Sequence, residues 1–491
     1  MIKIKTRKYQ EKVLKFANKS KTYCPLLWNH TCIKTDKSYD FCCVAQHHPH
    51  DLDEQYRNPS AGMSIDEWWN SDEINKARKD MLNGKKPAQC THCWKLETAD
   101  IKSPRHDALE SLGIIKGLTW KTTTSSKVEK SFIKSSSKYI INSSMIGPVD
   151  PESILRKMKI TNDNTESTVQ NKAMSITPAS YDIKFGNLCN LKCRMCHASS
   201  SSQINKEAKQ HEDEHKTYPH TYEDESQFTW FLDRSASFWK DFEKKKDVIT
   251  DLKFTGGEPL LIETLIKFLH ELVNNGLSKK ISLNLITNAT TVNKELIEKV
   301  FTHFYSVKLN VSVDGTGDVY DYIRYPGRWK TLDKNLRLLT KYPYLQVSIS
   351  PTIQVLNCIN FIDILAYAEE LNALSENKIF AIVQPTINYV EYPWYHSITN
   401  MSSEERQLLH EYYKYHENND VKVKHKTHKK VLNDLADYVL QARSRYPKYV
   451  SKCREEFIKY TATLDKIRNQ SFKQGCKREW KFYNEGIISD Q

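Results

Sequence analysis

The chain has 491 residues, 39% of them hydrophobic and 11% aromatic, which is enough for roughly two or three domains with a sizeable core. Although 27% of the residues are charged, this apolar content excludes a largely disordered chain. No run approaches the roughly 18 apolar residues of a membrane span, and the basic N-terminus lacks the apolar stretch of a secretory signal. We therefore expect a soluble cytoplasmic protein with no membrane contact.

The net charge of +13 comes from 73 Lys and Arg against 60 Asp and Glu. Basic residues gather in residues 1–21 and again in Lys422–Lys430. Such runs can contact phosphate groups or an acidic partner, but a solvated surface is the more common reason for them. Nucleic acid is therefore kept as the less favoured kind of partner.

The first unit of the chain, residues 20–107, is rich in Trp and Cys. A Ser-, Thr- and Lys-rich stretch at 118–144 has the composition of a linker or an exposed insertion. From about residue 178 strand and helix patterns alternate, interrupted by a charged helical insertion at 204–245, and a Ser402–Glu405 capping box opens a helical tail. The predicted strands are 180–185, 248–255, 281–287, 307–313, 345–353 and 379–387, and the predicted helices among them are 262–275, 294–301, 329–341 and 359–371.

Strands that alternate with helices predict parallel βα units wound in a right-handed sense. We therefore expect an α/β fold, a partial (β/α)6 TIM-like barrel, with its chemistry at the carboxyl ends of the strands. The expected divisions are a small α+β domain at 1–110, a linker or insertion at 111–177, the barrel at 178–390 and a helical C-terminal region at 391–491.

Three cysteines, Cys189, Cys193 and Cys196, follow the first barrel strand directly, with three and then two residues between them. Thiolates suit iron–sulfur clusters or zinc. A structural zinc site needs four protein ligands, and His197 is a poor fourth because it adjoins Cys196. Three thiolates would instead leave a [4Fe–4S] cluster with one iron open to another molecule.

This CxxxCxxC loop resembles the defining motif of the radical S-adenosylmethionine (SAM) superfamily. Thr255–Pro259 (TGGEP) looks like the GGE motif of that family, where glycines let the backbone approach SAM closely and Glu258 is expected to brace the loop. Asn310–Gly315 (NVSVDG) is similar to the SxDG segment. The alternatives are an ordinary turn at Asp314 and a surface ion pair at Arg324. The resemblance assigns SAM binding to Gly256, Gly257, Glu258, Pro259, Thr287, Asn288, Ser312, Asp314 and Arg324, and it assigns no catalytic side chain.

A second cysteine set, Cys24, Cys42, Cys90 and Cys93, has the spacing C-x17-C-x47-C-x2-C. It resembles the twitch domain, a shortened SPASM domain in which four thiolates hold an auxiliary [4Fe–4S] cluster. The domain stands before the barrel here, as in N-terminal-twitch radical SAM proteins of phages. Cys42 is preferred to Cys43 on spacing, and a structural zinc ribbon is the alternative. We expect the remaining cysteines to be buried apolar residues.

The resemblance implies an oxidoreductase or peptide-modifying enzyme that cleaves SAM reductively to a 5′-deoxyadenosyl radical, which takes hydrogen from a substrate C–H bond. It implies two [4Fe–4S] clusters, SAM and an electron donor such as flavodoxin or ferredoxin. The expected substrate is a peptide or protein, or else a small molecule. The alternatives are an enzyme that modifies nucleic acid such as tRNA, and a non-enzymatic zinc-binding module. The expected location is the cytoplasm, which would be that of the host if the protein is viral.

Overall fold

The computed structural model describes most of the barrel and its flanking helices, and less of the N-terminal part. The described residues are 21–45, 59–98, 103–111, 177–212, 219–375, 381–382, 388–390, 393–419, 422–441 and 447–488. The predicted linker, apart from residues 111 and 177, and all but the last residue of the basic run at 1–21 lie outside them. Within the described part of the chain, no helix has the length and apolar character needed to cross a lipid bilayer.

A single sheet runs through the molecule in the strand order β2-β1-β3-β4-β5-β6-β7-β9. From β3 to β9 each strand pairs in parallel with the next, which confirms the predicted α/β fold with a parallel sheet. A second, small sheet pairs β8 with β10. The bounds are β1 His30–Ile33, β2 Tyr39–Asp40, β3 Ser180–Lys184, β4 Asp251–Thr255, β5 Ser282–Thr287, β6 Ser306–Val311, β7 Leu345–Ile349, β8 Thr352–Ile353, β9 Ala381–Ile382 and β10 Asn388–Tyr389.

The N-terminal part of the chain joins this sheet, which its sequence did not indicate. Strand β1 pairs in parallel with β3, and β2 pairs antiparallel with β1 at the edge. The segment HTCI is too short to show a strand period, so its place in the sheet depends on long-range pairing. The first unit is therefore continuous with the barrel sheet.

Three predicted strands differ from the observed ones by more than two residues or are divided. The strand expected from 248 begins at Asp251, because Lys246–Val248 form a 3-10 turn. The strand expected at 345–353 divides into β7 and β8 around Pro351, which has no N–H to donate to a ladder. Of the strand expected at 379–387, only Ala381–Ile382 lies within the described residues.

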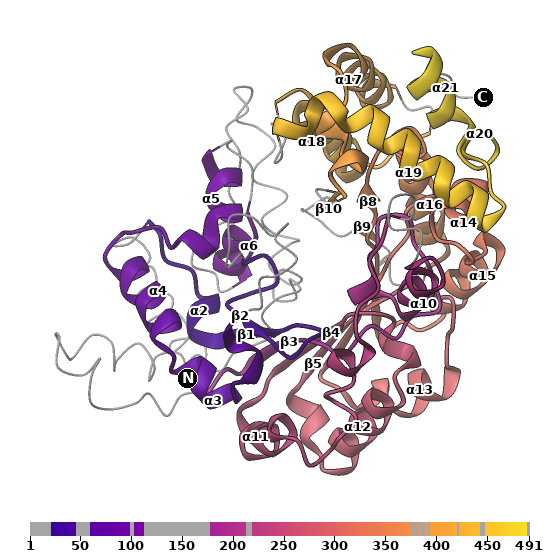
Figure 1. The fold of residues 1–491 in the computed structure, drawn as a ribbon. Coiled ribbons are helices and arrows are strands. Elements are labelled where there is room, and N and C mark those ends of the chain that lie inside the picture. Colours follow the sequence, from indigo (N-terminus) through magenta and orange to yellow (C-terminus); the bar gives the residue numbers. More distant parts are fainter. Residues whose placement is uncertain are drawn as a thin grey trace, which may run out of the picture.

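Helices cover one face and both ends of the sheet (Figure 1). The predicted capping box at Ser402 and Glu405 is confirmed, and Gly276, which follows the helix at 263–274, has a left-handed φ of 69°. The N-terminal helices are α2 Leu26–Asn29, α3 Ile65–Trp69, α4 Asp72–Leu82, α5 Thr91–Thr98 and α6 Pro104–Ser111. The barrel helices are α10 Ser202–Gln210, α11 Ser237–Lys245, α12 Glu263–Asn274, α13 Lys294–Lys299, α14 Gly317–Ile323, α15 Trp329–Leu339 and α16 Phe361–Leu374. The C-terminal helices are α17 Ser403–Asn418, α18 Lys426–Gln441, α19 Cys453–Arg468, α20 Phe472–Gly475 and α21 Lys477–Glu485.

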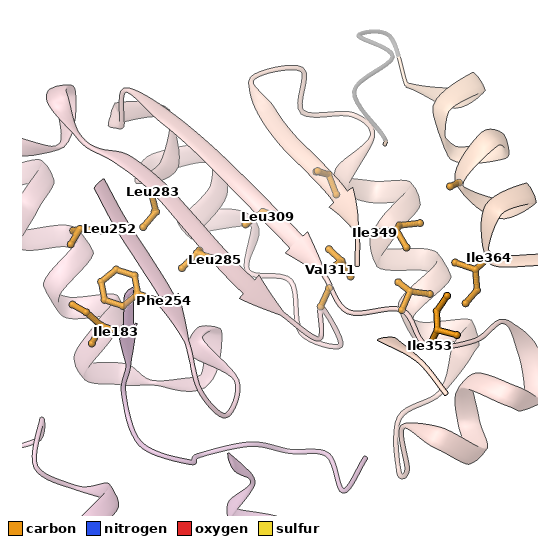
Figure 2. Packing of buried hydrophobic residues seen from close by; sticks show 14 of the residues in the cluster. Ile183, Leu252, Phe254, Leu283, Leu285, Leu309, Val311, Ile349, Ile353 and Ile364 are labelled. Carbon is orange, nitrogen blue, oxygen red and sulfur yellow. The ribbon is translucent and has the colours of Figure 1, made fainter. Parts of the chain in front are cut away.

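The core lies between the sheet and its helices. Alternate residues of a strand point to opposite faces, and one set is apolar and almost fully buried, for example Phe254 and Leu285. Figure 2 shows this set from Ile183 in β3 to Ile349 in β7. The opposite set, which we call the inner face, is largely polar and includes Asp182 and Lys253. Burial of the apolar set orients every strand end that carries a motif.

Candidate active site at the strand ends

The predicted motifs lie together because parallel strands end at the same edge of a sheet. The cysteine loop follows β3, the two glycines follow β4, and Thr287 is the last residue of β5. Ser312 follows β6 directly, and its N–H donates to the Thr287 carbonyl at 2.9 Å. Four segments that are far apart in the sequence therefore form one rim.

The three thiols of the cysteine loop are close enough to affect one another. Burial, followed by the neighbouring thiol of Cys193, raises the pKa of both Cys189 and Cys196 to about 12. Burial also raises the pKa of Cys193, and the Arg324 guanidinium opposes that rise. No set of three or more His, Cys, Asp or Glu side chains in the described residues is arranged at metal-ligand geometry. The three thiols thus lie near one another without forming a ready-made ligand set. Their high pKa values mean that thiolates would need a compensating positive charge such as a metal.

Backbone contacts hold the cysteine loop in place. The N–H of Lys192 donates to the Tyr325 carbonyl at 2.6 Å, and the N–H of Arg194 donates to the Ile323 carbonyl at 2.9 Å. On the other side of the loop, Ser201 Oγ donates to the Leu191 carbonyl at 2.6 Å. The loop is therefore fixed between the end of α14 and the start of α10.

The C-terminal helix α19 also grips this loop. Arg468 of α19 donates to the Lys192 carbonyl at 2.8 Å and forms a buried ion pair with Glu207 of α10, with 2.7 Å between Nη2 and Oε2. The hydroxyl of Tyr460, also on α19, donates to the Arg194 carbonyl. We call these contacts the α19 clamp.

The side chain of Arg194, between the second and third cysteines, is fully buried against the same helix. Its Nη2 lies 2.5 Å from Asp465 Oδ1, and its guanidinium carbon lies 3.7 Å from the centre of the Tyr322 ring. Nothing in the sequence indicated the α19 clamp or this ion pair. The partners are about 270 positions apart, and no local pattern connects them.

The two glycines after β4 are required by close packing against the cysteine loop. Gly256 has a φ of 112°, which favours glycine, and a Cβ on Gly257 would lie 2.1 Å from the Leu188 carbonyl oxygen. The Glu258 N–H donates to that same carbonyl at 2.7 Å. The glycine backbone therefore lies directly beside the cysteine loop.

Glu258 and its neighbours are bonded within the protein. The Glu258 carboxylate accepts from Thr287 Oγ1 at 2.7 Å and from the Asn288 N–H at 2.6 Å, and it also accepts from the Leu260 N–H. Asn288 Nδ2 donates to Asn190 Oδ1 of the cysteine loop at 2.9 Å, and Pro259 is buried. These side chains link the strand ends to one another, so they position the rim.

Asp314 and Arg324 form a buried ion pair at the end of β6. Arg324 Nη2 lies 2.5 Å from Asp314 Oδ2, and the Thr352 N–H donates to Asp314 Oδ1 at 2.7 Å. Burial alone would lower the pKa of Arg324, but Asp314 and then Cys193 outweigh it and raise the pKa. The Asp314 carboxylate is therefore occupied by protein groups, and Arg324 is the cation that it holds beside the thiols.

The N-terminal thiols also gather, from three separate segments. Cys24 precedes α2, Cys42 follows β2, and Cys90 and Cys93 flank the start of α5. Burial raises the pKa of Cys24 to about 11 and that of Cys93 to about 12, and it raises the pKa of Cys42, to which Cys43, Cys93, Cys90 and Cys24 then add. The four predicted ligands are thus within electrostatic reach of one another.

Cys43 lies between the N-terminal thiols and the sheet. It is the thiol with the largest effect on the pKa of Cys42, and it also acts on the pKa of Cys32 and Lys253, which belong to the sheet. Cys32 is 1% exposed on β1, and Cys358, Cys453 and Cys476 are buried. Their burial agrees with the expectation of apolar side chains.

Comparison with known proteins finds matches over the barrel part of the chain. The model of the radical SAM superfamily matches residues 183–353. The chain is 27% identical over 165 residues to the uncharacterized protein MJ0907 of Methanocaldococcus jannaschii, covering 33% of this chain and 48% of that protein. It is 27% identical over 150 residues to the sporulation killing factor maturation protein SkfB of Bacillus subtilis, covering 30% of each. The chain thus spans half or less of the length of these curated relatives.

Solved structures show a weaker likeness. SuiB of Streptococcus suis bound to its precursor peptide SuiA has a TM-score of 0.31 and 15% identity, covering 68% of this chain and 61% of that one. SuiB bound to S-adenosylmethionine has a TM-score of 0.30 and 16% identity, covering 49% and 48%. The family match does not include residues 24–93, so the twitch resemblance and the phage resemblance stay predictions. Residues 183–353, with their cysteine loop and glycine turn on adjacent strand ends, are a radical SAM domain.

Proposed function

We propose that the protein is a radical SAM enzyme that modifies a peptide or protein at a C–H bond. The observation that carries this proposal is the close packing of the glycine turn against the cysteine loop, with the Leu188 carbonyl accepting from Glu258 N–H at 2.7 Å. That packing brings a ligand-accessible backbone beside three thiols and Arg324. A [4Fe–4S] cluster held by Cys189, Cys193 and Cys196 would supply the electron for reductive cleavage of SAM, the chemistry that would lead to loss of hydrogen from a substrate C–H bond.

The residues at the rim fit a cluster that has three protein ligands. Cys189, Cys193 and Cys196 are soft donors whose pKa values are raised chiefly by burial, as expected of thiols that need a metal for deprotonation. His197, the possible fourth ligand, has its ring bonded to Ser199 Oγ at 2.5 Å and near Ser200 Oγ. The rim therefore offers three donors, which favours an iron–sulfur cluster over structural zinc.

The rim also suggests which residues would hold SAM. Gly256 and Gly257 present backbone groups, Ser312 is half-buried, and Arg324 carries a fixed positive charge suited to a carboxylate. Asp314 would act by orienting Arg324, and Glu258, Thr287 and Asn288 by holding the strand ends together. This differs from the resemblance, in which Ser312 and Asp314 both lie near SAM.

A second [4Fe–4S] cluster is proposed at Cys24, Cys42, Cys90 and Cys93, as in a twitch domain. The side chain of Arg105 supports this, because it donates to the Tyr23 carbonyl at 3.0 Å and opposes the raised pKa of Cys24. Four thiolates would give every iron of the cluster a protein ligand and leave none open to substrate. The cluster would therefore exchange electrons with the substrate radical or with a donor such as flavodoxin or ferredoxin. A zinc ribbon remains the competing occupant.

A peptide or protein substrate is favoured by the relative that is named for the maturation of a sporulation killing factor. A small-molecule substrate is the second candidate. The basic run at Lys422–Lys430, which suggested nucleic acid, is partly neutralised: Lys422 Nζ lies 3.0 Å from Asp363, and His428 Nδ1 lies 3.0 Å from Glu369. These pairs favour the interpretation of that run as a solvated surface.

Metal and sulfide analysis with a SAM cleavage assay tests the proposed function. After anaerobic reconstitution we expect about eight iron and eight sulfide per chain, as two four-iron clusters. With dithionite or a flavodoxin system the protein should release 5′-deoxyadenosine from SAM. Anaerobically purified protein that contains zinc and no sulfide would overturn the proposal in favour of a zinc-binding module.

A further inference from the structure

The inner face of the sheet is polar in successive rows. The strand register places Asp182, Lys253, Asn284, Lys308 and Gln346 side by side, one from each of β3 to β7. Lys184 and Thr255 form part of the next row toward the carboxyl ends, and so do Asn310 and Ser348. A parallel sheet covered on both faces normally has apolar residues on both. The polar residues of this face therefore indicate a role other than packing.

The charges on this face do not cancel near its carboxyl end. Lys253 Nζ pairs with Asp182 Oδ2 at 2.7 Å, and His30 has a pKa lowered to about 4 by burial, so it is neutral at pH 7. Asp251 lies one row nearer the amino end and accepts from Thr250 Oγ1 at 2.8 Å. Within the described part of the chain, the ammonium group of neither Lys308 nor Lys184 has a side-chain hydrogen bond or an ion pair, although Lys184 acts electrostatically on Asp182. Because Asp182 already pairs with Lys253, the two half-buried lysines leave a net positive charge on this face.

An uncompensated cation in a sheet interior destabilises the fold, which makes a structural role for Lys308 improbable. Burial, with a further effect of Lys253, lowers the pKa of Lys308 to about 8. Perturbed titratable groups gather at functional sites. Lys308 stands three residues before the end of β6, or about 10 Å below the rim. Lys184 is the last residue of β3, and its Cα lies 3.5 Å from where a Cβ on Gly256 would be.

We propose that this inner face binds a carboxylate of the substrate, with Lys308 as its cation and Lys184 adding positive charge to the same face. The inference rests on the proposed function, in which the substrate is a peptide, and it makes that peptide acidic, with an Asp or Glu side chain near the modified position. Lysine is a point charge that suits a single carboxylate. Phosphate sites commonly use clustered backbone N–H groups, and the N–H groups here serve the strand ladders. The side chains in the next row beside Lys308 are uncharged and bond to each other: Ser348 Oγ donates to Asn310 Oδ1 at 2.7 Å.

Binding of a fluorescein-labelled deca-glutamate peptide to the reconstituted full-length protein tests this proposal. We expect Lys308→Gln to weaken binding about five- to tenfold, the effect of one charged contact, and Lys308→Arg to keep most of the affinity. Lys334→Gln, which removes an exposed lysine of α15, is the matched control and should bind as the wild type does. A deca-asparagine peptide should not bind.

A labelling readout guards against a misfolded variant. In the wild-type protein, limited acylation at pH 8 with peptide mapping should modify Lys308, and deca-glutamate should protect it and leave Lys334 labelled. Equal binding by wild type and Lys308→Gln, or labelling of Lys308 that the peptide does not change, would overturn the proposal. Displacement by a decauridylate at equal concentration would overturn it in favour of phosphate. A wild type that cleaves SAM but does not bind the peptide defeats this inference alone, whereas failure to cleave SAM despite Lys308-dependent binding defeats the proposed function.

Discussion

The two cysteine sets are assembled in different ways. Cys189, Cys193 and Cys196 belong to one loop, and contacts from α10, α14 and α19 fix the backbone of that loop from outside. Cys24, Cys42, Cys90 and Cys93 come from three segments and meet only through packing of short elements around aromatic side chains such as Trp68 and Trp94. A contiguous set can bind metal with little help from the fold, whereas a dispersed set binds metal only as the fold forms. Loss of ligands should therefore affect chemistry at the first site, and both chemistry and local folding at the second.

The largest effect should come from the triple variant Cys189→Ala, Cys193→Ala, Cys196→Ala. It should lose about half of the iron, as one four-iron cluster of two, and all cleavage of SAM to 5′-deoxyadenosine. Its thermal unfolding midpoint should change little, because the loop keeps its backbone contacts. Iron analysis and chromatography of the nucleoside products measure these effects. The single variant Cys453→Ala removes a buried thiol outside both sites and is the control.

The double variant Cys90→Ala, Cys93→Ala should lose the other half of the iron. Because Trp94 adjoins Cys93 on α5, we also expect a changed tryptophan fluorescence from the N-terminal unit. SAM cleavage through the barrel loop should persist, and release of an oxidised product should fail. If SAM cleavage falls in step with product formation, the second cluster only stabilises the fold.

The α19 clamp should matter only for the barrel site. Arg468→Met leaves Glu207 buried without its main partner, and loss of one partner from a buried pair costs about 3–5 kcal/mol of unfolding free energy. Denaturant unfolding measures this loss, and iron retention should fall at the barrel site and not at the N-terminal one. Arg234→Met breaks an exposed pair with Glu271 and should cost less than about 1 kcal/mol. Equal losses in the two variants would show that the clamp is not needed.

The clamp also predicts a loss of stability in acid. Burial raises the pKa of Glu207, but Arg468 and Lys192 outweigh it and lower the pKa from 4.5 to about 2. Because the folded pKa is the lower one, the stabilisation is complete above about pH 4.5 and is lost as the pH falls toward 2. Unfolding measured across that range should show a smaller pH dependence in Glu207→Gln than in the wild type.

Substitution of Lys308 should change stability less than substitution of Arg468, and it should stabilise the fold at pH 7. Its pKa of about 8 in the folded protein is below the ordinary 10.5, so the folded state binds fewer protons between those values and stability rises with pH there. Lys308→Gln should remove this rise and gain on the order of 1–3 kcal/mol at pH 7. Chemical unfolding at pH 7 and pH 10 measures both. A less stable variant at pH 7 would mean that Lys308 has a partner that stabilises it.

The barrel was more predictable from sequence than the N-terminal unit. The cysteine loop, the glycine turn and the strand alternation are local patterns, so six strands and the rim motifs could be placed in advance. The pairing of β1 with β3, the α19 clamp and the occupied carboxylate of Asp314 depend on contacts between distant segments. Spacing favours Cys42 over Cys43, and that choice stays a prediction.

Electron paramagnetic resonance of the reduced, reconstituted protein, recorded before and after addition of SAM, tests the central claim most directly. The account predicts two overlapping iron–sulfur signals, of which only the one from the three-cysteine loop changes when SAM binds its open iron. That signal should be missing in the triple alanine variant and present in Cys90→Ala, Cys93→Ala. Spectra that SAM leaves unchanged in the wild type, or that respond to SAM in the triple variant, would contradict the assignment of the barrel loop as the SAM-binding site.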